Sequence, residues 1–275
     1  MSLAQRISRA PEAIAGITIL ICLMLVALSA PLLFPGDPLA ISGTPLLRPF
    51  VDATHWLGTD RLGRDVLAGV VHGARTSLLV GLVSAAAAIV LGSVVGTLAG
   101  FAGGLLDELL MRVTDAFQTV PGFLMALAFV STIGPSLMVV VTAIALASWT
   151  APARLVRAEV LSIRERDYVA SARAIGMHPL KIAFREILPN ALPPVLGLSA
   201  IIVAGAILTE AALSFLGLGD PNRVTWGGMI AEGRAVLRSA PFLSIIPGVA
   251  LVLTVLGVYL AGEGLVEATS RRSRA

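Results

Sequence analysis

Residues 78–101 read LLVGLVSAAAAIVLGSVVGTLAGF, a run of 24 residues without one charged side chain. A helix needs about 20 predominantly apolar residues to cross the hydrocarbon core of a bilayer. It also pairs its backbone polar groups internally, which lipid requires because no water is present there to bond them. This run therefore predicts a membrane-spanning helix and marks the chain as an integral membrane protein.

Five other segments have the same apolar character: residues 13–34, 118–133, 135–152, 191–209 and 240–262. We expect residues 118–133 to extend backward through Arg112 and Asp115, which lie three apart and predict a local ion pair. Residues 191–209 continue past Glu210 to Leu218. The prediction is an all-α integral membrane protein with six transmembrane helices.

The composition of the chain excludes several other classes of protein. Of the 275 residues, 56% are hydrophobic and 13% charged, whereas soluble domains carry about 25% charged side chains. The net charge is +3 and the basic residues form no dense block, so no nucleic-acid partner is expected. A single cysteine, Cys22, allows neither a disulfide within the chain nor a cysteine-based metal site. The main partner that the composition predicts is membrane lipid.

The distribution of basic residues predicts the orientation in the membrane. The first span follows Arg6 and Arg9, as a secretory signal does, but its 22 residues exceed the usual signal core and favour an uncleaved anchor. With the N-terminus inside, the cytoplasmic segments hold 13 lysines and arginines and the outer loops hold 7. Cytoplasmic flanks accumulate positive charge. We therefore expect both termini in the cytoplasm and residues 35–75 and 219–239 outside.

The longest cytoplasmic segment, residues 153–189, is charged yet helically patterned. Gly176 permits a sharp turn, and Pro179 suits the first turn of a second helix, so a bent helix pair is predicted. This pair is either a docking surface for a partner protein or an ordinary loop whose arginines hold it to the lipid headgroups. The pattern leaves both interpretations open.

Small residues recur at four-residue spacing along the second span: Ser84, Ala88, Gly92, Gly96 and Gly100. Small side chains let two membrane helices approach closely, where lipid supplies no hydrophobic drive for association. We interpret Gly92, Gly96 and Gly100 as a helix-packing stripe; the alternative is that the stripe lines a transport pathway.

Glu210 is the acid best placed to lie within the membrane, and an ionisable residue there is a functional candidate by default. If Glu210 faced a central cavity and titrated, the chain would be a subunit of a proton-coupled secondary transporter. The other interpretation places Glu210 near the outer interface, hydrogen-bonded to a neighbouring helix or subunit, so whether it lies in a pathway or at an interface stays open.

No catalytic or metal-binding residue is expected in this chain. Its one lysine, Lys181, is not part of a phosphate-binding G-x-x-x-x-G-K-[ST] loop. The histidines His55, His72 and His178 are all expected in loops, so no helix carries an H-E-x-x-H zinc pair. The chain is therefore not predicted to be an ATPase or a zinc protease.

Residues 168–190, YVASARAIGMHPLKIAFREILPN, resemble the EAA loop of ABC importer permeases. The features that match are a small-residue triplet, a glycine after three further residues and a final Leu-Pro: Ala170, Ser171, Ala172, Gly176, Leu188 and Pro189. Residues 55–79 and 210–233 are similar to the dipeptide and oligopeptide (nickel) branch, in its C-type permease subunit. Two positions depart from the pattern, since Ala170 replaces the usual acid and Glu186 stands where histidine is common.

The resemblance implies a type I ABC importer permease fold with a cytoplasmic coupling helix. It implies that the ATPase-coupling loop consists of Tyr168, Ala170, Ser171, Ala172, Gly176, Leu180, Phe184, Leu188 and Pro189. The division of the chain would be an anchor helix and external loop (1–76), a permease core (77–269) and a cytoplasmic tail (270–275).

The resemblance also implies the partners and the mechanism. The chain would form half of a translocation pathway for peptides by alternating access, in a prokaryotic plasma membrane. Its partners would be a second homologous permease, two cytoplasmic ATPases that bind ATP and Mg²⁺, and an extracytoplasmic binding protein. No cofactor is expected in the chain itself. Dipeptides, oligopeptides, nickel, glutathione and haem-like ligands all occur as substrates in this branch.

Overall fold

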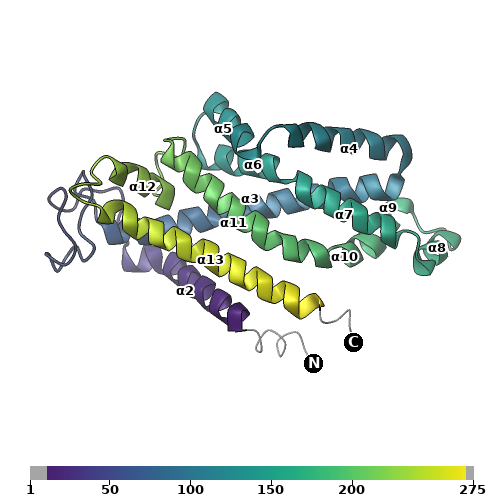
Figure 1. The fold of residues 1–275 in the computed structure, drawn as a ribbon, viewed down its shortest axis with the longest axis horizontal. Coiled ribbons are helices and arrows are strands. Elements are labelled where there is room, and N and C mark those ends of the chain that lie inside the picture. The colour runs from purple at the N-terminus through teal and green to yellow at the C-terminus, as the bar shows by residue number, and fades with distance from the viewer. Residues whose placement is uncertain (1–10, 271–275) are drawn as a thin grey trace.

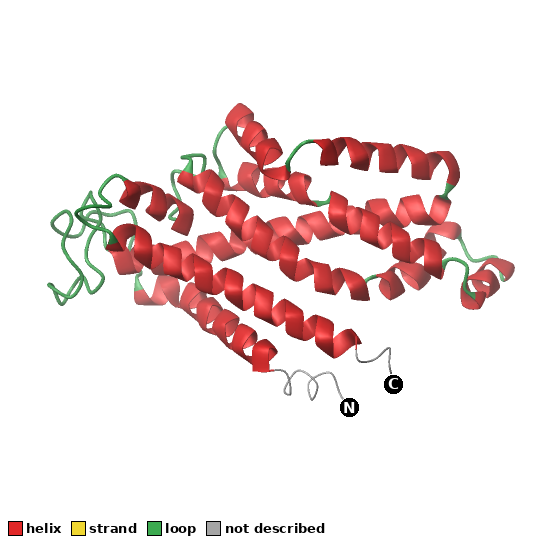
Figure 2. Ribbon diagram, in the orientation of Figure 1, coloured by secondary structure: helices red, strands yellow, loops and turns green. Residues whose placement is uncertain are grey.

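The computed structural model describes residues 11–270, which form a helical bundle without a strand in that range (Figures 1 and 2). The long helices are α2 (Pro11–Leu33), α3 (Val66–Ala102), α11 (Pro193–Phe215) and α13 (Phe242–Ser270). The shorter elements are α4 (Gly104–Thr119), α5 (Gly122–Ile133), α6 (Leu137–Ser148), α7 (Thr150–Ile163), α8 (Asp167–Ala174), α9 (Pro179–Lys181), the π-helix η1 (Ile182–Ile187), α10 (Leu188–Ala191) and α12 (Trp226–Arg234).

The four long helices are each long and apolar enough to cross a membrane. Two bent pairs, α4 with α5 and α6 with α7, pass the same test together, which makes six spans if each pair is one span. Large apolar side chains point outward from these helices, among them Leu28, Leu32 and Val252 at 65%, 84% and 64% exposure. Such a surface is stable only against lipid or another apolar partner.

Helix α3 begins at Val66, well before the predicted start at residue 78. Asp65 caps its N-terminus by accepting a hydrogen bond from the backbone N–H of Ala68 at 2.9 Å. At 37 residues the helix is about 55 Å long and extends beyond the bilayer core. The expectation that His72 lies in a loop is therefore wrong, and the predicted domain boundary at residue 76 falls inside this helix.

The predicted span over residues 118–133 is broken in the structure. Helices α4 and α5 meet at an angle of 84° at Val120 and Pro121. Proline disfavours a helical conformation in the residue before it, and Val120 is extended, with φ −96° and ψ 126°. The predicted Arg112–Asp115 pair is also wrong, because Asp115 lies 2.5 Å from Arg154 on α7.

Close helix contacts hold the bundle together. Helices α2 and α13 pack antiparallel, since Gly16 lies against Gly257 and Ala261, and Gly264 lies against Ala13. A core of small and branched side chains joins α3, α5, α6 and α11, including Ala85, Ala88, Val130, Ile144 and Ile202. These contacts fix the positions of the packed helices relative to one another.

The two ends of the bundle differ in structure (Figure 1). The short helices α8, α9 and α10 lie at one end, while α12 and the loop between α2 and α3 lie at the opposite end. The residues used to predict the location of the termini, Arg6, Arg9, Arg271, Arg272 and Arg274, lie outside the described residues, as does most of the predicted tail at 270–275.

Candidate functional site

The first candidate site is the turn between α8 and α9. Gly176 has φ +77°, and its N–H donates to the carbonyl of Arg173 while that of Met177 donates to Ala172. These two bonds, at 3.0 and 3.1 Å, form a Schellman motif, which ends a helix with a left-handed residue. The sharp turn predicted at Gly176 is therefore present, followed by a second helix that begins at Pro179.

This turn presents apolar side chains surrounded by cations. Ile175 and Leu180 are 78% and 53% exposed, and the nearby Arg173, Lys181 and Arg185 are exposed as well. Nothing lies within 4 Å of a Cβ placed on Gly176, so the apex is open. The arrangement is a small projecting surface suited to insertion into a groove of a partner.

The predicted coupling residues divide into two groups. Six are exposed: Tyr168, Ala170, Ser171, Gly176, Leu180 and Pro189. Ala172 is buried and Phe184 and Leu188 are half-buried, so these three anchor the segment. The predicted set does not include Ile175, the most exposed apolar side chain of the turn. Its position just before the glycine that ends the helix was the available signal for this exposure.

The turn is anchored to the end of α3. The guanidinium of Arg173 lies over the ring of Phe101, 5.7 Å from its centre, and Arg164 Nη1 donates to the carbonyl of Gly100 at 2.8 Å. In addition, one buried apolar cluster joins α7, α8 and η1 through Val160, Val169 and Ile182. Movement of the turn is therefore tied to α3 and α7.

The glycine stripe of α3 lies against α7. A Cβ on Gly92 would lie 2.5 Å from the carbonyl oxygen of Trp149, and one on Gly100 would lie 2.9 Å from that of Arg157. Between them, Gly96 faces the carbonyl of Ala153. The contacts advance along both helices in the same direction, so the two backbones pack closely and in parallel.

Glu210 is 1% exposed and lies where α3, α11 and α12 meet. Its two carboxylate oxygens accept hydrogen bonds from Ser214 at 2.7 Å and from Ser77 at 3.1 Å. The hydroxyl of Ser77 also accepts from the backbone N–H of Trp226, the first residue of α12. Glu210 thereby connects three helices through hydroxyl partners.

Next to this cluster lies a cavity of about 350 Å³ at the end of the bundle that carries α12. Ser214 lines it, together with charged residues of the α2–α3 loop and α12, including Arg64 and Glu232. Burial raises the pKa of Glu232, while the guanidinium of Arg64, 3.6 Å away, opposes that effect. The cavity walls therefore carry both signs of charge.

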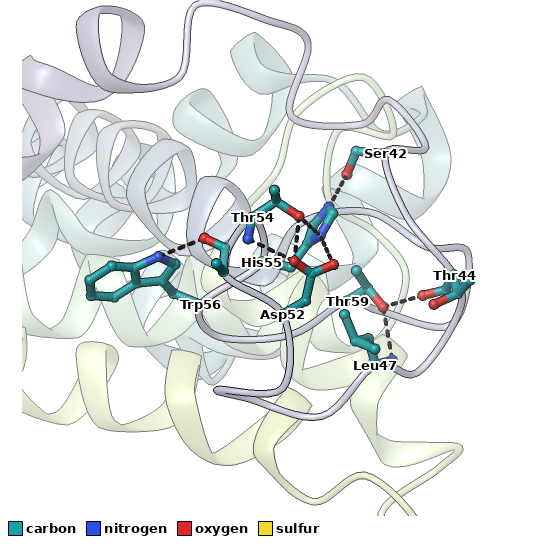
Figure 3. Close-up of polar contacts among 9 residues, drawn as sticks. Ser42, Thr44, Leu47, Asp52, Thr54, His55, Trp56 and Thr59 are labelled. Atoms are coloured by element: carbon teal, nitrogen blue, oxygen red, sulfur yellow. Dashed lines mark hydrogen bonds and ion pairs between the residues drawn. The ribbon is translucent and has the colours of Figure 1, made fainter.

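The loop between α2 and α3 is held by internal hydrogen bonds (Figure 3). His55 contacts Ser42, Thr54 and Asp52, at 3.1, 2.9 and 3.5 Å. The hydroxyl of Thr59 donates to the carbonyl of Thr44. This network gives a defined shape to a loop that contains no helix or strand and only one isolated β-bridge, between Thr59 and Asp65.

The sequence is similar to proteins of known transport systems. The family model described as "binding-protein-dependent transport system inner membrane component" matches residues 72–275. A probable peptide ABC transporter permease protein of Sinorhizobium fredii is 43% identical over 97% of this chain and 91% of its own length. A di/tripeptide transport system permease protein of Pseudomonas aeruginosa is 38% identical over 93% of this chain and 86% of its own length.

The fold has a counterpart among solved structures. A chain of the inward-facing MetNI methionine ABC transporter aligns with a TM-score of 0.58 and 20% identity, covering 72% of this chain and 95% of its own. At that identity the likeness concerns the fold, which is that of a type I importer permease.

The fold, the projecting turn and the sequence matches define an inner-membrane transport component. The chain belongs to the binding-protein-dependent transport system inner membrane component family. It is a permease subunit of an ABC importer and therefore a transport component, not an enzyme. This assignment replaces the proton-coupled alternative.

Proposed function

We propose that the chain forms half of the translocation pathway of an importer for peptides and works by alternating access. Support comes from two relatives that cover most of the chain, one named a probable peptide permease and the other a di/tripeptide permease. A glutathione transport system permease protein of Pectobacterium atrosepticum, itself named for a small peptide, is 36% identical over 96% of the chain. The substrate class is therefore a short peptide.

The turn around Gly176 is the contact with a cytoplasmic ATPase. The observation that carries this assignment is the exposed Schellman turn, which presents Ile175 and Leu180 at the end of the bundle. Apolar side chains in water favour burial in a groove, and the surrounding cations favour an acidic rim on the partner. Nucleotide-driven closure of the ATPases would then move this turn together with α3 and α7.

The assembly that fits this role has four further components. They are a second homologous permease, two ATPases that bind ATP and Mg²⁺, and an extracytoplasmic binding protein. Both termini and the turn lie in the cytoplasm, and the α2–α3 loop and α12 lie outside. In that arrangement the cavity beside Glu232 opens toward the binding protein.

Affinity purification of the tagged chain in mild detergent, with mass spectrometry and an ATPase assay, tests the assembly. We expect a second permease and P-loop subunits to copurify, with ATP hydrolysis. A solitary chain without hydrolysis, under conditions that preserve a known ABC importer, would contradict the proposal.

The variant Gly176→Arg tests the docking role of the turn. Arginine at φ +77° is strained by about 1 kcal/mol and projects into the partner's groove. We expect the subunit to insert normally while ATP hydrolysis no longer drives uptake of a radiolabelled dipeptide, or while the ATPases no longer copurify.

Gly217→Arg is the matched control for that variant. Gly217 has φ +82° and also ends its helix in a Schellman motif, with open space around its Cβ, but it lies at the opposite end of the bundle. We expect this variant to retain its ATPases. Equal loss of ATPases in both variants would point to backbone strain and not to docking.

A further inference from the structure

The segment that joins the projecting turn to α11 contains a π-helix. In η1 the N–H of Leu188 donates to the carbonyl of Ala183, five residues back instead of four. Such wide turns are rare and occur mostly as single turns, frequently at functional sites. The π-helix η1 lies between the turn at Gly176 and Pro193, the first residue of α11, and therefore helps to connect the turn to that long helix.

Pro189 explains why the backbone widens here. Inside an α-helix a proline ring clashes with the carbonyl four residues earlier, in this case that of Arg185, and it donates no hydrogen bond. A wider turn relieves the clash. The segment nevertheless stays packed, because Ile182 and Ile187 are 1% and 0% exposed within the cluster that includes Val169 of α8.

Two side chains meet at one carbonyl of the wide turn. Asn190 Nδ2 donates to the carbonyl oxygen of Glu186 at 2.7 Å, and the hydroxyl of Tyr168 donates to the same oxygen at 3.4 Å. Asn190 Nδ2 also lies 3.5 Å from the Tyr168 hydroxyl. Tyr168 comes from α8, before the projecting turn at Gly176, and Asn190 comes from α10, after it. The carbonyl of Glu186 therefore joins the chain segments on the two sides of the projecting turn.

We propose that Tyr168 and Asn190 are positioning residues that clamp the Glu186 carbonyl, hold residues 182–187 in the wide-turn form and make α8 and α11 move as one unit. The functional part of this inference rests on the proposed docking of the turn to an ATPase. With the clamp intact, displacement of α8 is transmitted to α11, which extends to the outer end and carries Glu210. Without the clamp, the wide turn flexes and absorbs part of the displacement.

The test uses Tyr168→Phe and Asn190→Ala in the complex purified through the tagged chain. Hydrogen exchange of the backbone amides of residues 182–191 is followed by mass spectrometry. We expect exchange to quicken about three- to tenfold in each variant, as the loss of a hydrogen bond implies. The double variant should be no faster than the faster single variant, because both side chains act on one carbonyl.

Two controls make the same chemical changes elsewhere in the chain. They are Tyr259→Phe on α13, where the tyrosine is 56% exposed, and Asn222→Ala in the outer loop. Neither should alter exchange in residues 182–191. Unchanged exchange in Tyr168→Phe and Asn190→Ala would overturn the clamp.

Spin labels test the transmission of movement directly. They are placed at Asp167→Cys on α8, an exposed residue outside the predicted coupling set, and at Ile201→Cys on α11, in a Cys22→Ser background. Distances are measured without nucleotide and with ATP plus vanadate. We expect one narrow distance distribution with the clamp intact and a broader one in Asn190→Ala. Equal widths in the two backgrounds would overturn the transmission role.

The outcome for the clamp is separable from that for docking. If Gly176→Arg leaves coupling intact while Asn190→Ala quickens exchange, the docking proposal fails and the clamp stands as a structural device. If Gly176→Arg uncouples transport and Asn190→Ala leaves exchange and distances unchanged, the clamp alone fails.

Discussion

At the residue scale, single side-chain volumes decide how closely α3 approaches α7. Gly96 faces the carbonyl of Ala153, and a Cβ there would lie 3.0 Å from Cβ of Val156. Gly205, on α11, has nothing within 4 Å of the same position. The chain thus contains a crowded and an open helical glycine for direct comparison.

The variant Gly96→Ala should lower the stability of the chain by about 1–3 kcal/mol, because the added methyl group forces the two backbones apart. Gly205→Ala should be neutral or slightly stabilising, since alanine is the better helix former by about 1 kcal/mol. Thermal unfolding in detergent, followed by size-exclusion chromatography, measures both. A Gly96→Ala chain as stable as the Gly205→Ala chain would contradict close packing.

Glu210 provides a second test at the residue scale. Glu210→Ala leaves the hydroxyls of Ser77 and Ser214 without their buried acceptor, at a cost of about 1–3 kcal/mol. Glu210→Gln retains an acceptor and a similar volume, so it should lose less stability and keep uptake ATP-dependent and insensitive to external pH. Loss of a pH-gradient-driven component of uptake in Glu210→Gln would contradict the structural role given to this residue.

At the element scale, α7 is tied to α4 by two ion pairs of different exposure. Arg157 makes a two-point contact with Asp107, with Nε to Oδ1 at 2.5 Å and Nη2 to Oδ2 at 2.7 Å. The Asp107 and Arg157 side chains are 14% and 33% exposed. Arg154 and Asp115 pair with side chains 49% and 60% exposed. The bidentate and less exposed pair is the stronger link between the helices.

We therefore expect Asp107→Ala to lower stability by about 1–3 kcal/mol, and Asp115→Ala by less than about 1 kcal/mol. Asp107→Ala leaves the partly buried guanidinium of Arg157 without its acceptor. Asp115→Ala removes the partner of Arg154, whose guanidinium water already reaches. Melting temperatures of the two variants in the same detergent give the comparison. Similar melting temperatures for Asp107→Ala and Asp115→Ala would show that the less exposed ion pair does not stabilise the chain more than the exposed pair.

At the scale of the whole molecule, the two ends of the bundle should lie on opposite sides of the membrane. Ser171 is exposed at the end that carries the projecting turn, and Trp56 is 64% exposed in the α2–α3 loop. Trp226 is not a suitable probe of the outer face. It is fully buried, and its indole N–H donates to the carbonyl of Val70 at 3.0 Å.

Labelling with a membrane-impermeant maleimide tests this orientation in whole cells, after removal of the outer membrane where the host has one. In a Cys22→Ser background, Trp56→Cys should react in intact cells and Ser171→Cys only after the membrane is permeabilised. The opposite pattern would reverse the proposed topology. Reaction of both in intact cells would exclude a placement of the two ends on opposite sides.

Much of this architecture is predictable from the sequence because it depends on local composition. Uncharged runs of spanning length predict the long helices, since the cost of unpaired backbone groups in lipid applies wherever the run occurs. Four-residue glycine spacing predicts a close helix contact, and Gly176 followed by Pro179 predicts the turn between two helices. The resemblance of residues 168–190 to the EAA loop adds the prediction of a coupling role, which composition alone leaves undecided.

The tertiary structure decided the features that depend on contacts between distant parts of the chain. Asp115 has a neighbour at Arg112, but folding brings Arg154 to it. Glu210 accepts a hydrogen bond from Ser77 on α3, 133 positions away, and the clamp on the Glu186 carbonyl draws on Tyr168 and Asn190, which are 22 positions apart. Sequence spacing determines which residues share a helix face, whereas hydrogen bonds between helices require a geometry that only the packed bundle specifies.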